Sequence, residues 1–179
     1  MIYTSYYDSP VGRILLAAKS GALVGLWMEN QKYFLGSLRE EQIKKEEYPV
    51  LAQTRKWLDQ YFAGERPEIS KLKLAPMGSA FRQTVWEILC QIPFGELTTY
   101  GEISKKIAAK YGKEHMSAQA VGGAVGHNPI SIIIPCHRVV GTNGSLTGYA
   151  GGIEKKIWLL THEGVNMEKL FVPKKSTAP

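Results

Sequence analysis

Residues 99–126 read TYGEISKKIAAKYGKEHMSAQAVGGAVG and hold two helix-start signals in close succession. Thr99 followed by Glu102 is a capping-box pair, which predicts a helix that begins after Thr99 and continues through the lysine-rich segment. A short connection leads to Ser117, an N-cap residue that predicts a second helix through about Gly126. Two short helices joined by a tight connection are typical of a helix-turn-helix, so this part of the chain is predicted to be helical.

Further elements are predicted on both sides of this helix pair. Apolar residues recur at helical spacing from Phe81 onward, behind Ser79 as an N-cap. Beyond the pair, an apolar, β-branched run that ends at Pro135 predicts a buried strand. A glycine-rich loop then covers residues 141–152, and a last helix is expected over about 153–163.

The first part of the chain has a different pattern. Three segments rich in β-branched, aromatic and other apolar residues predict an antiparallel hairpin or meander, and a helix that begins with proline is expected to cover it. A mostly charged stretch before that helix is expected to be solvated surface or loop. The expected strands are 2–7, 12–18, 22–28 and a short 71–74, the expected helix is 49–62, and the charged stretch is 39–47.

The change from strand to helical periodicity predicts a domain boundary near Pro76. Residues 64–79, GERPEISKLKLAPMGS, mix glycine, proline and charge without a helical period. We therefore expect an α/β domain over 1–76, a mainly helical domain over 77–170 and a flexible tail over 171–179.

The composition excludes several classes of protein. Of the 179 residues, 44% are hydrophobic and 21% are charged, unlike disordered, collagen-like or coiled-coil chains. Apolar runs fall far short of the ~20 residues of a membrane helix and the chain does not begin like a secretory signal, so a cytoplasmic protein is expected. The net charge of +6 favours a polyanionic partner. Two cysteines and four scattered histidines predict no metal site.

Cys136 is the strongest candidate for a reactive residue. It follows Ile-Ile-Ile-Pro and precedes His137, a candidate base. A free thiol with a pKa of ~8.5 is only slightly ionised at neutral pH, so a nucleophilic cysteine needs a base or a positive field. Adjacent side chains of an extended segment point to opposite faces, so this pair needs a local turn or a bridging water. A buried, inert cysteine beside a core histidine is the alternative.

Five short motifs lie around this pair: Asn128-Pro129, Pro135-Cys136-His137-Arg138-Val139, Thr147-Gly148-Tyr149-Ala150-Gly151-Gly152, Trp158-Leu159-Leu160 and His162-Glu163-Gly164. They closely resemble those of the O6-alkylguanine-DNA alkyltransferases, also called methylated-DNA–protein-cysteine methyltransferases. The resemblance covers about Phe81 to Val165, and the N-terminal half is similar only in architecture. It implies a ribonuclease-H-like α/β domain of antiparallel strands plus a helix, followed by a mainly α, winged-helix-like DNA-binding domain.

The resemblance implies direct-reversal DNA repair, in which the alkyl group of O6-alkylguanine, and of O4-alkylthymine as a further substrate, moves to the protein's own cysteine. Cys136 is then the acceptor, His137 activates it through a water, Glu163 orients the histidine, and Asn128 lies at the hinge before the active-site segment. No cofactor is implied, because the alkyl group comes from the DNA. The thioether product lacks an easy leaving group, so this methyltransferase acts once per molecule.

Base flipping is also implied, because a protein thiolate cannot attack O6 in line inside a duplex. Tyr100 resembles the family tyrosine that displaces the phosphate of the flipped nucleotide and hydrogen-bonds guanine N3, and Tyr149 resembles the loop aromatic that packs on the base. By the same resemblance, the backbone carbonyls of Cys136 and Val139 read the exocyclic amine and the amide of Ala150 donates to O6.

The implied partner is double-stranded DNA, bound by a monomer, with no membrane. Gly122 and Gly123 leave a nearly smooth helix face for the minor groove, and Lys105 and Lys106 are predicted phosphate neighbours. Gln119 aligns with the family's usual arginine, which fills the space left by the flipped base. Glutamine lacks the charge and the planar fork of arginine, so this position departs from the family pattern.

Two other functions stay open at this stage. Alkyltransferase-like proteins bind damaged DNA and recruit other factors, but they replace the cysteine that this chain has at position 136. A hydrolase with a Cys-His-Glu arrangement would turn over repeatedly. Stoichiometric labelling with loss of activity distinguishes an alkyl acceptor from such an enzyme.

Overall fold

The computed structural model describes residues 1–39 and 43–174 and divides into two compact units. Unit 1 comprises Met1–Met77 together with Pro129–Ile133, and unit 2 comprises Gly78–Asn128 and the chain from Ile134. The chain passes from unit 1 to unit 2 between Met77 and Gly78, close to Pro76, but the short segment Pro129–Ile133 of the later chain also lies with unit 1. Among the described residues, no helix is both long enough and apolar enough to cross a membrane.

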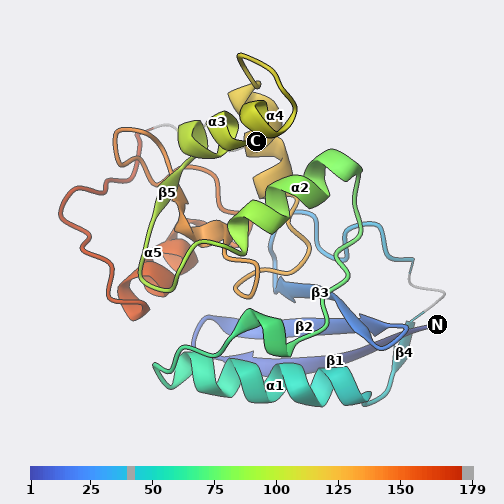
Figure 1. Ribbon diagram of the computed structural model, residues 1–179. Coiled ribbons are helices and arrows are strands. Elements are labelled where there is room, and N and C mark those ends of the chain that lie inside the picture. Colours follow the sequence, from blue (N-terminus) through green and yellow to red (C-terminus); the bar gives the residue numbers. More distant parts are fainter. Residues whose placement is uncertain (40–42, 175–179) are drawn as a thin grey trace. The chain divides into compact units, whose positions relative to one another are not determined.

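Unit 1 is built on a four-stranded sheet with the order β3-β2-β1-β4 (Figure 1). The first three strands form the predicted antiparallel meander, and β4 adds a short parallel strand beside β1. The charged stretch was expected to be solvated surface or loop; residues 44–47 are exposed as expected, but Ile43–Lys45 form β4 instead of a loop, and Ile43 packs against the core cluster around Trp27. Residues 40–42 of that stretch lie outside the described residues. The strands are β1 (Ile2–Ser9), β2 (Gly12–Lys19), β3 (Ala22–Met28) and β4 (Ile43–Lys45).

Helix α1 (Pro49–Phe62) covers one face of this sheet (Figure 1), and it begins with proline as predicted. Tyr7 Oη donates a hydrogen bond of 2.6 Å to Asp59, which joins strand and helix. The strand predicted over 71–74 is reduced to a bridge at Leu74, because the preceding residues form the 3-10 turn η2 (Ile69–Lys71).

The strand predicted before Pro135 is also wrong. Of this run only Ile130 pairs, in a single bridge with Leu26 of β3. The chain then turns: Ile132 has a φ of +70°, and Ile133 N donates to Ser131 O at 2.8 Å, the hydrogen bond of a γ-turn. The isoleucines of this run are at most 1% exposed, so their β-branched pattern marked burial rather than a strand.

Unit 2 begins with the predicted helices, each at its predicted N-cap. The capping box of α3 is complete, since Thr99 Oγ1 accepts from Glu102 N and Glu102 Oε2 accepts from Thr99 N. Trp86 Nε1 donates to Ala124 O at 2.8 Å and so supplies a partner to a carbonyl in the last turn of α4. The helices and caps are α2 (Ala80–Leu89) with Ser79, α3 (Tyr100–Lys110) with Thr99, and α4 (Ala118–Gly126) with Ser117.

The rest of unit 2 consists of short elements and one helix. Strand β5 (Thr98–Thr99) pairs in parallel with β6 (Val139–Val140), directly after the 3-10 turn η3 (Cys136–Arg138). Helix α5 (Ile153–His162) ends at Glu163 as its C-cap. Phe171, expected in a flexible tail, instead pairs with the Ser145 segment, and residues 175–179 lie outside the described residues.

Candidate active site

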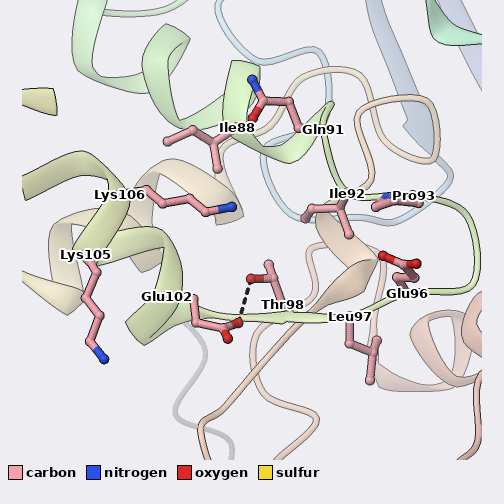
Figure 2. A pocket seen from close by; sticks show the side chains of 10 residues that line it. All are labelled: Ile88, Gln91, Ile92, Pro93, Glu96, Leu97, Thr98, Glu102, Lys105 and Lys106. Carbon is pink, nitrogen blue, oxygen red and sulfur yellow. Dashed lines mark hydrogen bonds between the residues drawn. The ribbon is translucent and has the colours of Figure 1, made fainter. Parts of the chain in front are cut away.

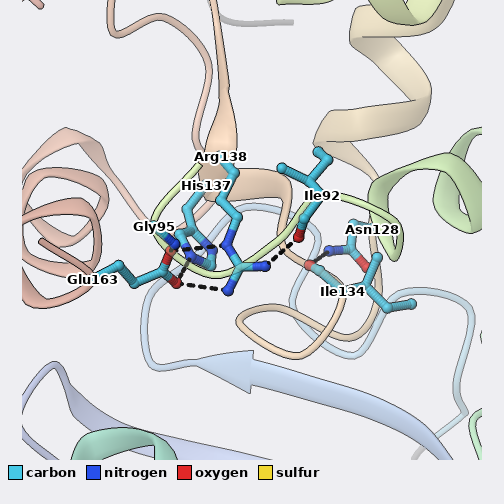
Figure 3. Close-up of polar contacts among 7 residues, drawn as sticks. All are labelled: Ile92, Gly95, Asn128, Ile134, His137, Arg138 and Glu163. Carbon is cyan, nitrogen blue, oxygen red and sulfur yellow. Dashed lines mark hydrogen bonds and ion pairs between the residues drawn. The ribbon is translucent and has the colours of Figure 1, made fainter. Parts of the chain in front are cut away.

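Cys136 opens the turn η3 and is 5% exposed. The local turn that the Cys-His pair requires is therefore present. Asn128 Nδ2 donates to Cys136 Sγ at 3.2 Å and to Ile134 O at 2.8 Å, the second of which is drawn in Figure 3. Burial raises the pKa of the Cys136 thiol, whereas the Asn128 hydrogen bond and the positive charge of Lys156 lower it. Asn128 and Lys156 thus favour the thiolate form of Cys136, whereas burial disfavours it.

His137 is fully buried and bound to Glu163. Its Nε2 lies 2.6 Å from Glu163 Oε1. An ionised carboxylate only accepts hydrogen bonds, so Nε2 carries the proton and the neutral ring presents Nδ1 as an acceptor. That Nδ1 atom is buried and bonds to none of the described residues. Burial lowers the pKa of His137, and the charges of Arg138 and Lys156 lower it further against the opposing pull of Glu163.

The Glu163 carboxylate accepts hydrogen bonds from several groups, among them His137, Arg138 and Gly95 (Figure 3). Besides His137, it accepts from Arg138 Nε at 2.8 Å and Nη2 at 2.9 Å, and from Gly95 N at 3.2 Å. Burial acts to raise the pKa of this carboxyl, but the hydrogen bonds and charges of His137 and Arg138 hold it well below its usual range. The sequence reasoning missed Arg138, although a lone arginine within an otherwise apolar run was a readable signal.

Lys156 is a second residue that the sequence reasoning missed. It is fully buried, and its Nζ donates to Val139 O at 2.6 Å and to Thr147 O at 2.9 Å. Tyr100 Oη donates to the same Thr147 carbonyl at 3.2 Å. Burial lowers the pKa of Lys156 to about 8 and raises that of Tyr100, so the tyrosine is a phenol. The readable signal was a lysine on the apolar face of α5, three residues after Ile153.

The groups expected to contact the base lie around the cluster formed by Cys136, His137, Glu163 and Lys156. Tyr149 is 7% exposed, and its ring centroid lies 6.4 Å from that of His137 with the rings nearly perpendicular. The carbonyl of Cys136 accepts from Val139 N, and that of Val139 accepts from Lys156 Nζ. Ala150 follows Tyr149 in the loop before α5.

The residues expected to meet DNA lie on α3 and α4, and none is in the cluster around Cys136. Gln119 is exposed, and a Cβ added at Gly122 or Gly123 would meet no atom within 4 Å. Lys105 and Lys106 are exposed at the rim of a pocket of about 460 Å³. Figure 2 shows this pocket between the end of α2, the segment that leads into β5, and α3, with Ile88, Ile92 and Leu97 among its lining residues.

Known protein families and their members match nearly the whole chain. Residues 2–76 match the family model described as the ribonuclease-like domain of 6-O-methylguanine DNA methyltransferase, and residues 80–165 match the model of its DNA binding domain. The methylated-DNA–protein-cysteine methyltransferase of Haemophilus influenzae is 41% identical over 92% of this chain and 87% of its own. That of Methanosarcina acetivorans is 41% identical over 91% and 99%.

Solved structures give the same result. The chain is similar to Mycobacterium tuberculosis OGT, crystallised in complex with DNA, with a TM-score of 0.78 and 40% identity over 90% of this chain and 93% of that one. This chain thus resembles these proteins over about nine-tenths of its length, including both units and the segments that hold Cys136, His137 and Glu163. The chain belongs to the methylated-DNA–protein-cysteine methyltransferase family.

Proposed function

We propose that this protein repairs O6-alkylguanine in DNA by irreversible transfer of the alkyl group to Cys136 Sγ. The observation that carries the proposal is one buried cluster of unit 2, in which Asn128 donates to the thiol and Glu163 holds the neighbouring His137. Family membership and the match of residues 80–165 to a DNA binding domain support DNA as the substrate.

The reaction begins when the Cys136 thiol gives its proton, through a water, to His137 Nδ1. Glu163 stabilises the imidazolium that forms. The thiolate then attacks the alkyl carbon: the S–C bond forms, the C–O6 bond breaks, and its electron pair goes to the guanine. The guanine takes up one proton, so the net change is transfer of the alkyl group to sulfur and of the thiol proton to the base. The product thioether does not react further, which makes the protein a stoichiometric acceptor.

Five groups hold the flipped base in this scheme. Tyr100 is a protonated phenol and donates to guanine N3, after it leaves the Thr147 carbonyl that it binds in the free protein. Tyr149 packs on the base. The Cys136 and Val139 carbonyls accept from the exocyclic amine, and the amide of Ala150 donates to O6.

Helices α3 and α4 contact the DNA in this scheme. The open surface at Gly122 and Gly123 supports close approach of α4 to a minor groove. Gln119 hydrogen-bonds the base left without a partner, and Lys105 and Lys106 neutralise phosphates. O4-alkylthymine presents the same C–O bond to the thiolate and is a second substrate. One chain supplies every group of the scheme, so a monomer suffices.

The deciding experiment is the intact mass of the protein after incubation with a duplex that carries one O6-methylguanine, followed by peptide mapping. We expect one added methyl group on Cys136, saturating at one per protein. Cys136→Ala should bind the duplex and take up no methyl group. Cys90→Ala is the matched control, because Cys90 is the C-cap of α2 and burial raises the pKa of its thiol to about 11.

The other outcomes separate the competing functions. Tight binding without an adduct would support a protein that only recognises the lesion. Loss of the methyl group from DNA in excess over protein, with no adduct, would indicate a hydrolase that turns over. A methyl group on Cys90 would contradict the assignment of Cys136.

A further inference from the structure

Arg138 and His137 both donate hydrogen bonds to one carboxylate, that of Glu163. Glu163 Oε1 accepts from both His137 Nε2 at 2.6 Å and Arg138 Nη2 at 2.9 Å, while Arg138 Nε donates to Oε2 at 2.8 Å. Figure 3 shows the guanidinium alongside the carboxylate, with the imidazole on the same oxygen. The arginine thus makes the two-point contact that fixes the plane of the carboxylate, and the histidine has a single point.

The guanidinium is itself held in place on its other side. Arg138 Nη1 donates to Ile92 O at 2.6 Å, and the guanidinium lies 5.8 Å from the ring centre of Phe94. The same turn supplies Gly95 N to Glu163 Oε2 at 3.2 Å. Arg138 is 5% exposed. The turn at residues 92–95 therefore contacts both the cation and the anion, so groups other than His137 hold the carboxylate in its position.

The charges of this buried cluster decide the state of the imidazole. With neutral His137, Arg138 and Glu163 cancel, and a proton on His137 would leave a net positive charge away from water. Without the guanidinium, neutral His137 beside Glu163 would leave a net negative charge, and burial would favour uptake of a proton by the pair. A buried histidine–carboxylate pair that already holds this proton cannot accept one from a thiol.

We propose that Arg138 is a positioning residue that fixes Glu163 and keeps His137 a neutral base, with Nδ1 open to the thiol proton. The part concerning proton transfer rests on the proposed function, whereas the state of the imidazole is a property of the protein without DNA. The other titratable groups around His137 are Cys136 on η3, Lys156 and Glu163 on α5, and Tyr149 in the preceding loop. Lys156 acts in the same direction as Arg138.

The test is an NMR titration of the His137 imidazole nitrogens in the unalkylated full chain. In the wild type we expect a neutral ring with the proton on Nε2 from about pH 6 to about pH 8. In Arg138→Gln, the His137–Glu163 pair should hold an extra proton at about pH 7. The double variant Arg138→Gln/Glu163→Gln removes both charges and should restore the neutral ring, which a merely structural role of the arginine would not do.

The rate of a single turnover on methylated duplex gives the second readout. The acidic limb of the pH–rate profile should move upward by at least about one unit in Arg138→Gln, a loss of about tenfold in neutral imidazole at a fixed pH below the limb. Arg138→Lys keeps the charge but not the two-point contact, so its rate should fall several-fold while its limb stays at the wild-type pH.

Several results would overturn the proposal. One is a wild-type His137 that is already an imidazolium at neutral pH, a measurement that needs no variant to fold. Another is an Arg138→Gln variant that urea denaturation shows to be folded, but whose His137 imidazole titrates as in the wild type. If the ring behaves as expected but no variant or wild-type protein takes up a methyl group, the proposed function fails and the role of Arg138 in the ring's protonation stands.

Discussion

The side-chain amide of Asn128 donates to Cys136 Sγ at 3.2 Å from a point just before the chain enters the Pro129–Ile133 segment. The same Nδ2 donates to Ile134 O at 2.8 Å, where the chain returns to unit 2. One amide therefore joins the two ends of the Pro129–Ile133 segment and contacts the sulfur of Cys136.

Asn128→Ala should slow methyl transfer and weaken the fold. Loss of the hydrogen bond raises the pKa of Cys136 further, so the rate at neutral pH should fall about tenfold. Stability should fall by about 0.5–1.5 kcal/mol, because the Ile134 carbonyl loses the Asn128 donor but still accepts from Cys136 N at 2.8 Å. Single-turnover rates across pH and urea denaturation measure the two effects. Asn166→Ala removes an exposed loop amide and is the control; equal rates for Asn128→Ala and the wild type would contradict this role.

Tyr100→Phe should lower the rate of transfer with little change in DNA affinity. The phenol proton is lost, and removal of a positioned acid typically costs about 10²-fold. The measurement is the single-turnover rate beside the dissociation constant for lesion duplex. Tyr111→Phe at the other end of α3, where the hydroxyl contacts Thr84, is the matched control and should keep the wild-type rate. An unchanged rate in Tyr100→Phe would refute proton donation by this residue.

Mild acid should destabilise the protein through His137. The pKa of its buried ring lies below the ordinary 6.5, so below that pH the unfolded chain binds a proton that the folded chain does not. Stability is then present above pH 6.5 and is lost as the pH falls, by about 1.4 kcal/mol per pH unit at most. Glu163 adds a loss of the same sign below its ordinary 4.5.

Urea denaturation at several pH values tests this linkage. His137→Gln should give a shallower dependence than the wild type just below pH 6.5, the ordinary value for histidine. His115→Gln changes an exposed histidine and should keep the wild-type slope. Parallel curves for the wild type and His137→Gln would show that the buried ring contributes nothing to acid sensitivity.

Gly144→Ala should destabilise unit 2 by about 2–4 kcal/mol. Gly144 has a φ of +90°, and a Cβ there would lie 2.2 Å from Lys169 O. The substitution forces apart the contact in which Phe171 N donates to Gly144 O at 3.1 Å. Gly122→Ala is the control: its Cβ has open space within a helix, so stability should stay equal or rise by up to about 1 kcal/mol while DNA affinity falls. Equal stability of Gly144→Ala and the wild type would disprove the close contact.

Binding to duplex should weaken with rising salt, partly through Lys105 and Lys106. If each lysine neutralises one phosphate, the double alanine variant should reduce the slope of log affinity against log salt by about 2. Lys19→Ala removes an exposed lysine at the end of β2 and should leave the slope unchanged. An unchanged slope in the double variant would exclude these lysines from the DNA contact.

Local features of the fold were predictable because their causes are local. The meander of unit 1, the proline at the start of α1 and the caps at Ser79, Thr99 and Ser117 follow from neighbouring residues, and the structure has each of them. The run before Pro135 was mispredicted as a strand. Its β-branched residues are buried in turns, and burial without a pairing partner gives the same sequence pattern as a strand.

In the candidate site, too, some features follow from neighbouring residues and others depend on the tertiary structure. The sequence by itself determined the family, and it singled out Cys136 and the adjacent His137 as candidates, because the motifs around Cys136 are contiguous or nearly so. Only the tertiary structure decided that Arg138 and Gly95 share Glu163, and that Lys156 and Tyr100 meet at the Thr147 carbonyl. These pairs are 9 to 68 residues apart, and their protonation depends on burial and neighbouring charge, which arise only when distant segments pack together.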